Sequence, residues 1–290
     1  GTGLLVLGGT SLFTGTVTVN GGTLRLSGAG ARLGAPAATT QTVIRQGAML
    51  DVNAAGASTS LYTGGPTQPL IVLGPLTGSG LLDNSSATAA AVSIGTTAST
   101  AAGVFTGIIS NSGGGSLSVV RNGASGIVYL TGSNTYTGPT ILSGGAVLGV
   151  TNLANGGVAS SIGASSSGSA NLVFNGGTLL YTGGNASFTQ ITQTPSVSTD
   201  RLFTLAGNGS IDSSGNYGNA AYFAAIQNNA ALVFANTGTV AFAGTGVRTL
   251  TLTGNSMRGH WCLRSQARAK YLQSIRAVLS NLHQLRCCFF

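Results

Sequence analysis

Acid–base chemistry in this chain depends on four aspartates, because the sequence has no glutamate: Asp51, Asp83, Asp200 and Asp212. Enzymes that cleave polysaccharides need two or three carboxylates close together, as acid, base, nucleophile or Ca²⁺ ligands. No two of these aspartates are adjacent in sequence, although Asp200 and Asp212 could approach each other across one coil of a repetitive fold. No His or Lys precedes residue 254 to assist them. We therefore interpret this pair as solvated turn or strand-edge residues and the chain as a non-enzyme.

Other catalytic or binding sites have even less support. Both histidines, His260 and His283, lie in the last 36 residues, and the chain has no G-x-S-x-G motif for a serine nucleophile. The stretch GNSM at 254–257 resembles a subtilase nucleophile turn only faintly, and we interpret it as chance. No glycine-rich segment has the spacing of a phosphate-binding or dinucleotide-binding loop. The sequence nominates no catalytic, cofactor-binding or metal-binding residue, and we expect no cofactor.

Aromatic residues in the first 254 positions allow two interpretations. They could form an exposed strip on which sugar rings stack, or they could stack inside the core. Alternation places some of them on the same face as Val and Leu, which favours the core. The residues concerned are Phe13, Tyr136, Phe174, Tyr181 and Phe188.

The composition is that of a β-rich, turn-rich chain. Only 6% of the 290 residues are charged, against roughly a quarter in ordinary soluble domains. Hydrophobic residues make up 42%, which argues against disorder driven by charge, and glycine contributes 47 residues without the three-residue period of collagen. Polar residues interrupt every apolar run well before the roughly 18 residues that a membrane-spanning helix needs.

The composition changes abruptly near residue 254. Residues 255–290 hold six of the 12 basic residues and no acid, so the pI near 10 describes this tail rather than the body. The tail also holds Cys262, Cys287 and Cys288, which are too few and too poorly spaced for a zinc site. We expect a repeat region at 1–254 and a tail at 255–290 that is helical or disordered. A change of reading frame or an annotation artefact explains this tail best; the alternatives are a membrane-surface helix or a nucleic-acid-binding arm.

The body contains internal repeats. A shift of 123 positions aligns LGGTSLFTGTVTVNGGTLRL at 7–26 with LTGSNTYTGPTILSGGAVLG at 130–149, without a gap. A shift of 155 aligns VNGGTLRLSG at 19–28 with FNGGTLLYTG at 174–183. A weaker similarity joins LGAP at 33–36 to IGAS at 162–165. Turn, apolar alternation and aromatic position coincide, so the similarity reflects a repeated structural unit.

Each unit reads as strand, corner, strand. Period-two alternation puts Val17 and Val19 on one face before Asn20-Gly21-Gly22, and Leu24 and Leu26 on one face after it. The later copy is less regular, because the apolar Ile141 stands where Thr18 is polar.

An Asn-Gly corner could close an antiparallel hairpin, but recurrence along the chain and the scarcity of charge favour a parallel β-solenoid. With about 20 residues in each coil, the body would form roughly 12 coils and a rod of about 55 to 60 Å.

Several segments resemble autotransporter-associated β-strand repeats, which build the passenger regions of bacterial surface proteins. The similar strings are GSNTYTGPTILSGGAVL (132–148), NLANGGVASSIGASSSGSANLVFNGGTLLYTG (152–183), RLFTLAGNGSID (201–212) and GVRTLTLTG (246–254). The resemblance covers most of residues 1–254 and implies an all-β, right-handed parallel β-helix.

The resemblance also implies a function. It implies a surface-displayed or secreted, adhesin-like stalk of an autotransporter at the outer membrane, with no catalytic motif to transfer. The alternatives are a polysaccharide lyase or glycosidase on the same fold, and lipid or nucleic-acid binding by the tail. We expect glycans or further copies of the chain as partners and no nucleic acid. Membrane contact is expected only through a translocator barrel, which these residues do not contain; they also show no signal peptide.

Overall fold

The computed structural model describes residues 2–12, 14–34, 41–95, 102–123, 126–183, 197–213 and 232–253, and the backbone of 262–263. Within these ranges the protein consists of strands and one short 3₁₀ helix, η1 (Ser169–Asn171). None of the helices in these ranges has the length and apolarity to cross a membrane. The predicted tail at 255–290 lies outside the described residues except for strand β25.

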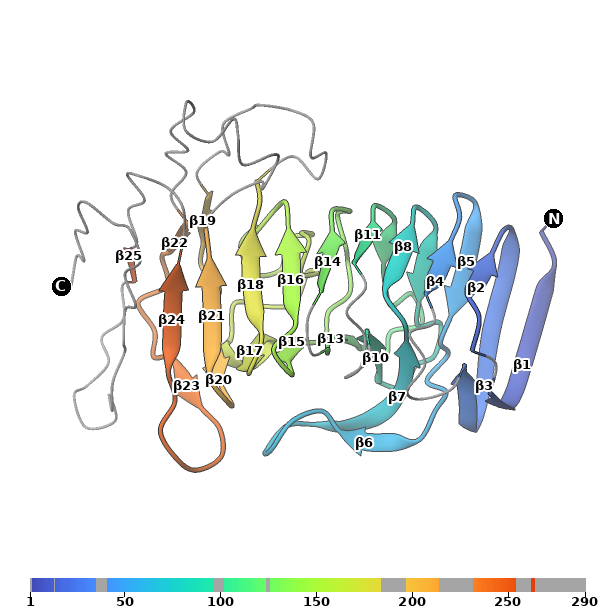
Figure 1. Ribbon diagram of the computed structural model, residues 1–290, viewed down its shortest axis with the longest axis horizontal. Coiled ribbons are helices and arrows are strands. Elements are labelled where there is room, and N and C mark those ends of the chain that lie inside the picture. Colours follow the sequence, from blue (N-terminus) through green and yellow to red (C-terminus); the bar gives the residue numbers. More distant parts are fainter. Residues whose placement is uncertain are drawn as a thin grey trace.

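Successive strands stack into long sheets that run the length of the molecule (Figure 1). The largest sheet has nine parallel strands, one from each coil. In sheet order they are β2 (Val17–Val19), β4 (Thr42–Ile44), β8 (Leu76–Gly78), β11 (Gly103–Phe105), β14 (Ile127–Leu130), β16 (Val147–Val150), β18 (Thr178–Tyr181), β21 (Gly209–Asp212) and β24 (Leu250–Thr253).

The second sheet has eight strands, and its first pairing along the chain is an exception to the parallel arrangement. Among the named strands, only β6 and β7 pair antiparallel. In sheet order the strands are β23 (Ala241–Phe242), β20 (Thr204–Leu205), β17 (Leu172–Asn175), β15 (Thr140–Ser143), β13 (Leu117–Arg121), β10 (Ala90–Ile94), β7 (Thr67–Leu73) and β6 (Ser58–Ser60).

Two shorter parallel sheets complete the coils at opposite ends of the molecule. The five-stranded one contains β1 (Leu4–Ser11), β3 (Gly22–Leu33), β5 (Ala48–Asp51), β9 (Leu81–Asp83) and β12 (Ile108–Ile109). The three-stranded one contains β19 (Val197–Thr199), β22 (Leu232–Phe234) and β25 (Cys262–Leu263). This all-β arrangement of stacked parallel strands is consistent with the predicted β-solenoid.

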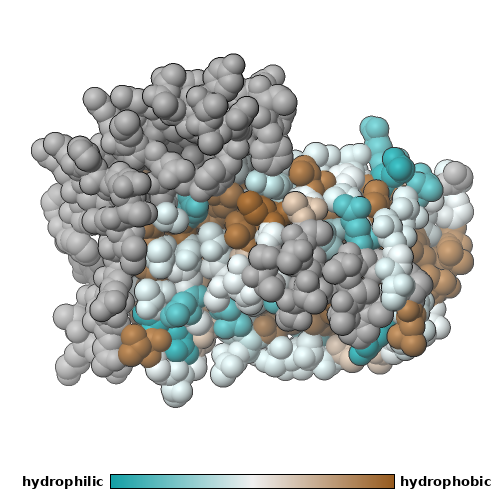
Figure 2. Space-filling model, viewed as in Figure 1, coloured by the Kyte–Doolittle hydropathy of each residue, from teal (hydrophilic) through white to brown (hydrophobic). Residues whose placement is uncertain are grey.

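The inward-facing side chains form one continuous core along the stack. Val17, Val19, Leu24 and Leu26 all belong to it, which confirms the two predicted apolar faces. The corner between them requires glycine, because Gly22 has a φ of 70°, in the region that L-residues avoid. At the first strand the cover is incomplete: Leu4, Leu5 and Val6 of β1 are exposed, and hydrophobic surface appears at that end in Figure 2.

The coils are longer and fewer than the sequence predicts. In the nine-stranded sheet, residues that pair on neighbouring coils lie from 20 positions apart, as for Ile127 and Val147, to 41 apart, as for Gly209 and Leu250. Nine strands in the largest sheet correspond to about 40 Å of stack at 4.8 Å per step. The estimate of roughly 12 coils was therefore wrong, because loops of different length are inserted at the corners.

The repeats in the sequence occupy different faces of the stack. The segment 16–26 forms β2 in the nine-stranded sheet and β3 in the five-stranded sheet, whereas its partner at 139–149 forms β15 in the eight-stranded sheet and β16 in the nine-stranded one. The repeated unit is thus a strand–corner–strand element that occurs at more than one corner of the coil.

Candidate functional site

Two aspartates that lie 32 positions apart in sequence lie side by side in the five-stranded sheet. Asp51 at the end of β5 pairs in register with Asp83 at the end of β9, and both are buried. The Asp51 carboxylate accepts hydrogen bonds from Arg25 Nε at 2.7 Å and from Ser85 Oγ at 2.6 Å. It also accepts the backbone N–H groups of Ser85 and Asn53. Each oxygen of this carboxylate therefore has protein donors.

The same bond pattern continues in the next two coils. Asp83 accepts the backbone N–H and the hydroxyl of Ser112, together with the hydroxyl of Ser110. Asn111, one coil further on, accepts the backbone N–H of Thr137 at 2.8 Å and its hydroxyl at 3.4 Å. In each case an Asp or Asn side chain bonds both donors of one Ser or Thr in the following coil. We call this series, Asp51–Ser85, Asp83–Ser112 and Asn111–Thr137, the corner latch.

The corner latch differs from a catalytic carboxylate pair in what its oxygens do. Hydrolysis needs one carboxyl that holds a proton and another that faces substrate or water. Here the carboxylates point at backbone N–H and hydroxyl groups of the adjacent coil, and Arg25 balances one charge. The chemistry that this geometry supports is coil-to-coil attachment through charge-assisted hydrogen bonds.

The pair considered from the sequence, Asp200 and Asp212, is placed on different sheets. Asp200 follows β19 of the three-stranded sheet and accepts the backbone N–H of Gly156 at 2.7 Å. Asp212 ends β21 of the nine-stranded sheet and pairs in register with Thr253. Both side chains are half-buried rather than fully solvated. The Asp51–Asp83 pair was not expected from the sequence. Its signal there is an Asp at the end of one strand and, one coil later, a second Asp followed two residues on by a Ser.

A second buried polar cluster surrounds Arg201, which is 2% exposed. Its guanidinium donates to the carbonyls of Ala154, Ser165 and Gly163 at 2.9, 3.1 and 2.9 Å, and to Ser165 Oγ at 2.9 Å. These acceptors lie along the loop 151–168 between β16 and η1. Burial lowers the pKa of Arg201, while nearby Tyr136 and Asp200 act in the opposite direction. We call this arrangement the arginine clamp.

Tyr136 extends the same cluster. Its hydroxyl lies 2.7 Å from Thr140 Oγ1, which also donates to the carbonyl of Ile162 at 3.3 Å. Burial raises the pKa of the Tyr136 phenol, against smaller opposing effects of Thr140 and Arg201. The buried side of the loop 151–168 is thus held by hydroxyl and guanidinium groups rather than by a sheet.

The outer surface of that loop contains an open depression of about 520 Å³, which we call the serine cup. Hydroxyl, amide and backbone groups form its wall, and one rim residue, Gly156, is held by Asp200. Such a surface can exchange hydrogen bonds with hydroxylated ligands but offers no apolar anchor. The lining residues are Thr137, Gly156, Gly157, Ala164, Ser165, Ser166, Ser167 and Asn171.

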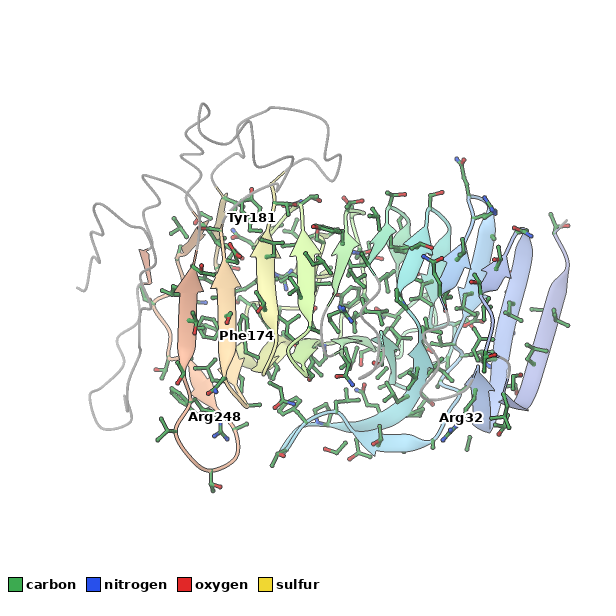
Figure 3. All side chains as sticks on the ribbon, viewed as in Figure 1. Arg32, Phe174, Tyr181 and Arg248 are labelled. Carbon is green, nitrogen blue, oxygen red and sulfur yellow. The ribbon has the colours of Figure 1, made fainter. Side chains whose placement is uncertain are left out.

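Three of the five aromatic residues considered from the sequence lie in the core, as expected. Tyr136, Phe174 and Tyr181 are each at most 2% exposed, and Figure 3 shows Phe174 inside the stack. Phe174 contacts Phe203 edge to face at 5.4 Å between ring centroids, and Phe203 contacts Phe234 in the same way at 5.7 Å. Phe13 and Phe188 lie outside the described residues.

Metal binding gains no support from the part of the chain that the structure describes, where no three His, Cys, Asp or Glu residues gather into a potential site. His260, His283, Cys287, Cys288 and the side chain of Cys262 lie outside that part. The stretch 254–257 does so too.

Fold and polar clusters together define a class of protein: a parallel β-stack whose buried charges join coils to each other. The chain is 35% identical over 261 residues, 88% of its length, to the adhesin BmaC autotransporter of Brucella suis biovar 1 (strain 1330). It spans only 6% of that relative's length. No family model and no solved structure matches the chain. The similarity confirms the resemblance to autotransporter passenger proteins that the repeats indicate.

Proposed function

We propose that the chain is a segment of a non-enzymatic, adhesin-like passenger stalk displayed at the bacterial cell surface or outer membrane. The observation that carries the proposal is the corner latch: the two buried carboxylates, Asp51 and Asp83, are committed to bonds between coils. The similarity to an adhesin autotransporter supports the same role. The stacked coils would extend a contact surface away from the membrane.

We further propose that the coils wind in a right-handed sense, as in a right-handed parallel β-helix. Connections between parallel strands of one sheet are strongly biased to this hand, because a right-twisted strand returns most easily that way. An experimental structure with a left-handed path from β14 through β15 to β16 would contradict this.

The proposed ligands are glycans, bound weakly and through repeated contacts. The serine cup supports this, because its hydroxyl, amide and backbone groups suit neutral sugar hydroxyls. A single open cup of this kind would bind at about millimolar strength, and clustering would raise the apparent affinity. Self-association through repeat faces is the other proposed interaction.

The experiment uses the full 290-residue chain, displayed at high density on beads and tested against a glycan array. We expect retention of a hydroxyl-rich glycan that Asn171→Ala weakens severalfold and that Ser58→Ala, an exposed change in β6, leaves unchanged. Asn171 also bonds Ser166 within the cup wall, so its loss disturbs the wall directly.

An assay for new reducing ends separates binding from cleavage. With acidic and neutral polysaccharides we expect no release above that of heat-treated protein. Release that survives purification and that Asp200→Asn abolishes would contradict the non-enzymatic proposal and favour the glycosidase or lyase alternative.

A further inference from the structure

One segment of the chain departs from the stack. Residues 58–69 form an antiparallel hairpin in which Ser58 pairs with Pro69 and Ser60 with Thr67, before β7 continues into the eight-stranded sheet. Figure 1 shows this hairpin running along the length of the stack, beneath β10, β13, β15 and β17, instead of around one coil. We call residues 58–69 the strap.

The strap covers a second apolar cluster, separate from the main core. Successive coils each place one apolar side chain on the outer face of the eight-stranded sheet, opposite the main core. In β17, for example, Val173 faces outward, between the core residues Leu172 and Phe174. These outward residues are nevertheless buried, at 0 to 6% exposure, together with Leu61 of the strap. We call the set the outer stripe; it comprises Ala91, Val120, Ile141, Val173 and Ala206.

Contacts at both ends of the strap join residues that are distant in sequence. Near its base, Ser118 of β13 donates a hydrogen bond of 2.7 Å to Gln68 Oε1, 50 positions away. Near its tip, Tyr62 packs against the same cluster as Ala243, the residue after β23. A methyl group placed on Gly244 would lie 3.7 Å from the Thr63 side chain. The strap therefore reaches from the coil of β7 to the coil of β23.

The surface that receives the tip is itself held in shape. Arg248 donates to the carbonyls of Ala243 and Thr245 at 2.9 and 2.8 Å, which closes the loop after β23. Arg248 lies at the same lower side of the stack as the strap in Figure 3.

We propose that the strap couples the coils between β7 and β23, so that they open and close as one unit. In a solenoid with contacts only between adjacent coils, the coils can open from an end or locally at low cost. The strap adds an apolar seal across the five coils that contribute to the outer stripe, so opening β15 or β17 requires loss of the outer stripe as well. Because the stripe is built from strands that follow the strap in sequence, the strap docks only after those strands have formed.

Hydrogen–deuterium exchange on the full chain tests whether the strap couples these coils. Leu61→Ser removes the apolar contact of the strap, and Leu12→Ser makes the same chemical change at an exposed position. We expect Leu61→Ser to raise exchange about tenfold or more in peptides covering β15 and β17, which the strap covers. Exchange in β3 and β5 should stay within about twofold, and Leu12→Ser should reproduce the unmodified chain throughout.

The outcome that overturns this coupling by the strap is equally specific. If Leu61→Ser raises exchange only within residues 57–73, the hairpin is an appendage that does not couple the coils. Gln68→Ala serves as a milder second variant if Leu61→Ser does not fold. Coupling by the strap predicts a smaller rise in exchange in β13, β15 and β17, and unchanged exchange there contradicts it.

Discussion

Asp51 and Asp83 each reach one coil ahead, to Ser85 and Ser112, whereas Arg201 reaches back across a single long loop at Ala154, Gly163 and Ser165. The first arrangement repeats with the coil, and the second occurs at an insertion. Both are buried, and both satisfy backbone groups that no sheet bonds. They differ in the sign of the charge and in the distance over which it acts.

The difference shows which backbone groups a solenoid leaves unpaired at its corners. At a regular corner, backbone N–H groups of the next coil have no partner in a sheet, and the short side chain of Asp or Asn can accept hydrogen bonds from them. Where an irregular loop turns its carbonyls inward, a donor with several N–H groups is required, and arginine supplies it. Arg121 is another buried arginine that donates to carbonyls, but two of its acceptors, Ile94 and Val147, lie at strand ends rather than in an inserted loop.

The largest expected effect is the loss of the arginine clamp. Arg201→Ala removes a buried guanidinium that donates to three carbonyls of the loop 151–168 and leaves a cavity in its place. We therefore expect a loss of about 4 kcal/mol in unfolding free energy, or failure to fold. Denaturant titration followed by circular dichroism measures it. Arg32→Ala, at an exposed arginine, is the matched control and should change stability by about 0.5 kcal/mol at most. Equal losses of unfolding free energy at the two sites would mean that the arginine clamp does not stabilise the loop 151–168.

The corner latch should be less costly to break, and its charge can be separated from its shape. Asp83→Ala leaves the Ser112 N–H and hydroxyl unpaired, and we expect a loss of about 2 to 3 kcal/mol. Asp83→Asn keeps one acceptor and reproduces the Asn111 form of the latch, so about 1 kcal/mol is expected. The same titration compares both. If Asp83→Asn is as damaging as Asp83→Ala, the negative charge and not the bond pattern holds these coils.

Alkaline pH should lower the unfolding free energy, and this effect should be absent near neutrality. Burial raises the pKa of Tyr181 to about 12 and raises that of Tyr136 further, whereas an unfolded tyrosine has a pKa near 10. Above about pH 10 the unfolded chain releases these protons while the folded chain retains them, so stability falls as pH rises. Below pH 10 this contribution is fully present.

Unfolding midpoints between pH 8 and 11.5 measure this dependence. The double variant Tyr136→Phe, Tyr181→Phe should lose stability less steeply above pH 10 than the unmodified chain. An identical slope in the two proteins would mean that other groups cause the alkaline loss.

Much of the body could be predicted from short-range patterns. Alternation at Val17–Val19 and Leu24–Leu26 identified core faces correctly, and the glycine corner at Gly22 has the positive φ that the Asn-Gly-Gly motif suggests. Phe174 and Tyr181 were assigned to the core for the right reason, because alternation along β17 and β18 places them on the inward face. The coil number was wrong, because composition does not reveal which corners carry long insertions such as 151–168.

The polar clusters were beyond the sequence for a different reason. Asp51 and Asp83 lie 32 positions apart, and their pairing depends on a coil length that varies between neighbours. Arg201 appeared as an ordinary basic residue, because its partners are carbonyls, which every residue has. No side-chain motif marks such a site.

By itself the sequence determined the local unit, strand–corner–strand, since alternation and glycine φ act within a few residues. Only the tertiary structure decided which face each copy occupies, because that depends on the loops between copies. Ile141 illustrates both. It breaks the polar alternation seen at Thr18, and it is apolar because the strap, about 80 positions earlier in the chain, folds over it and excludes water.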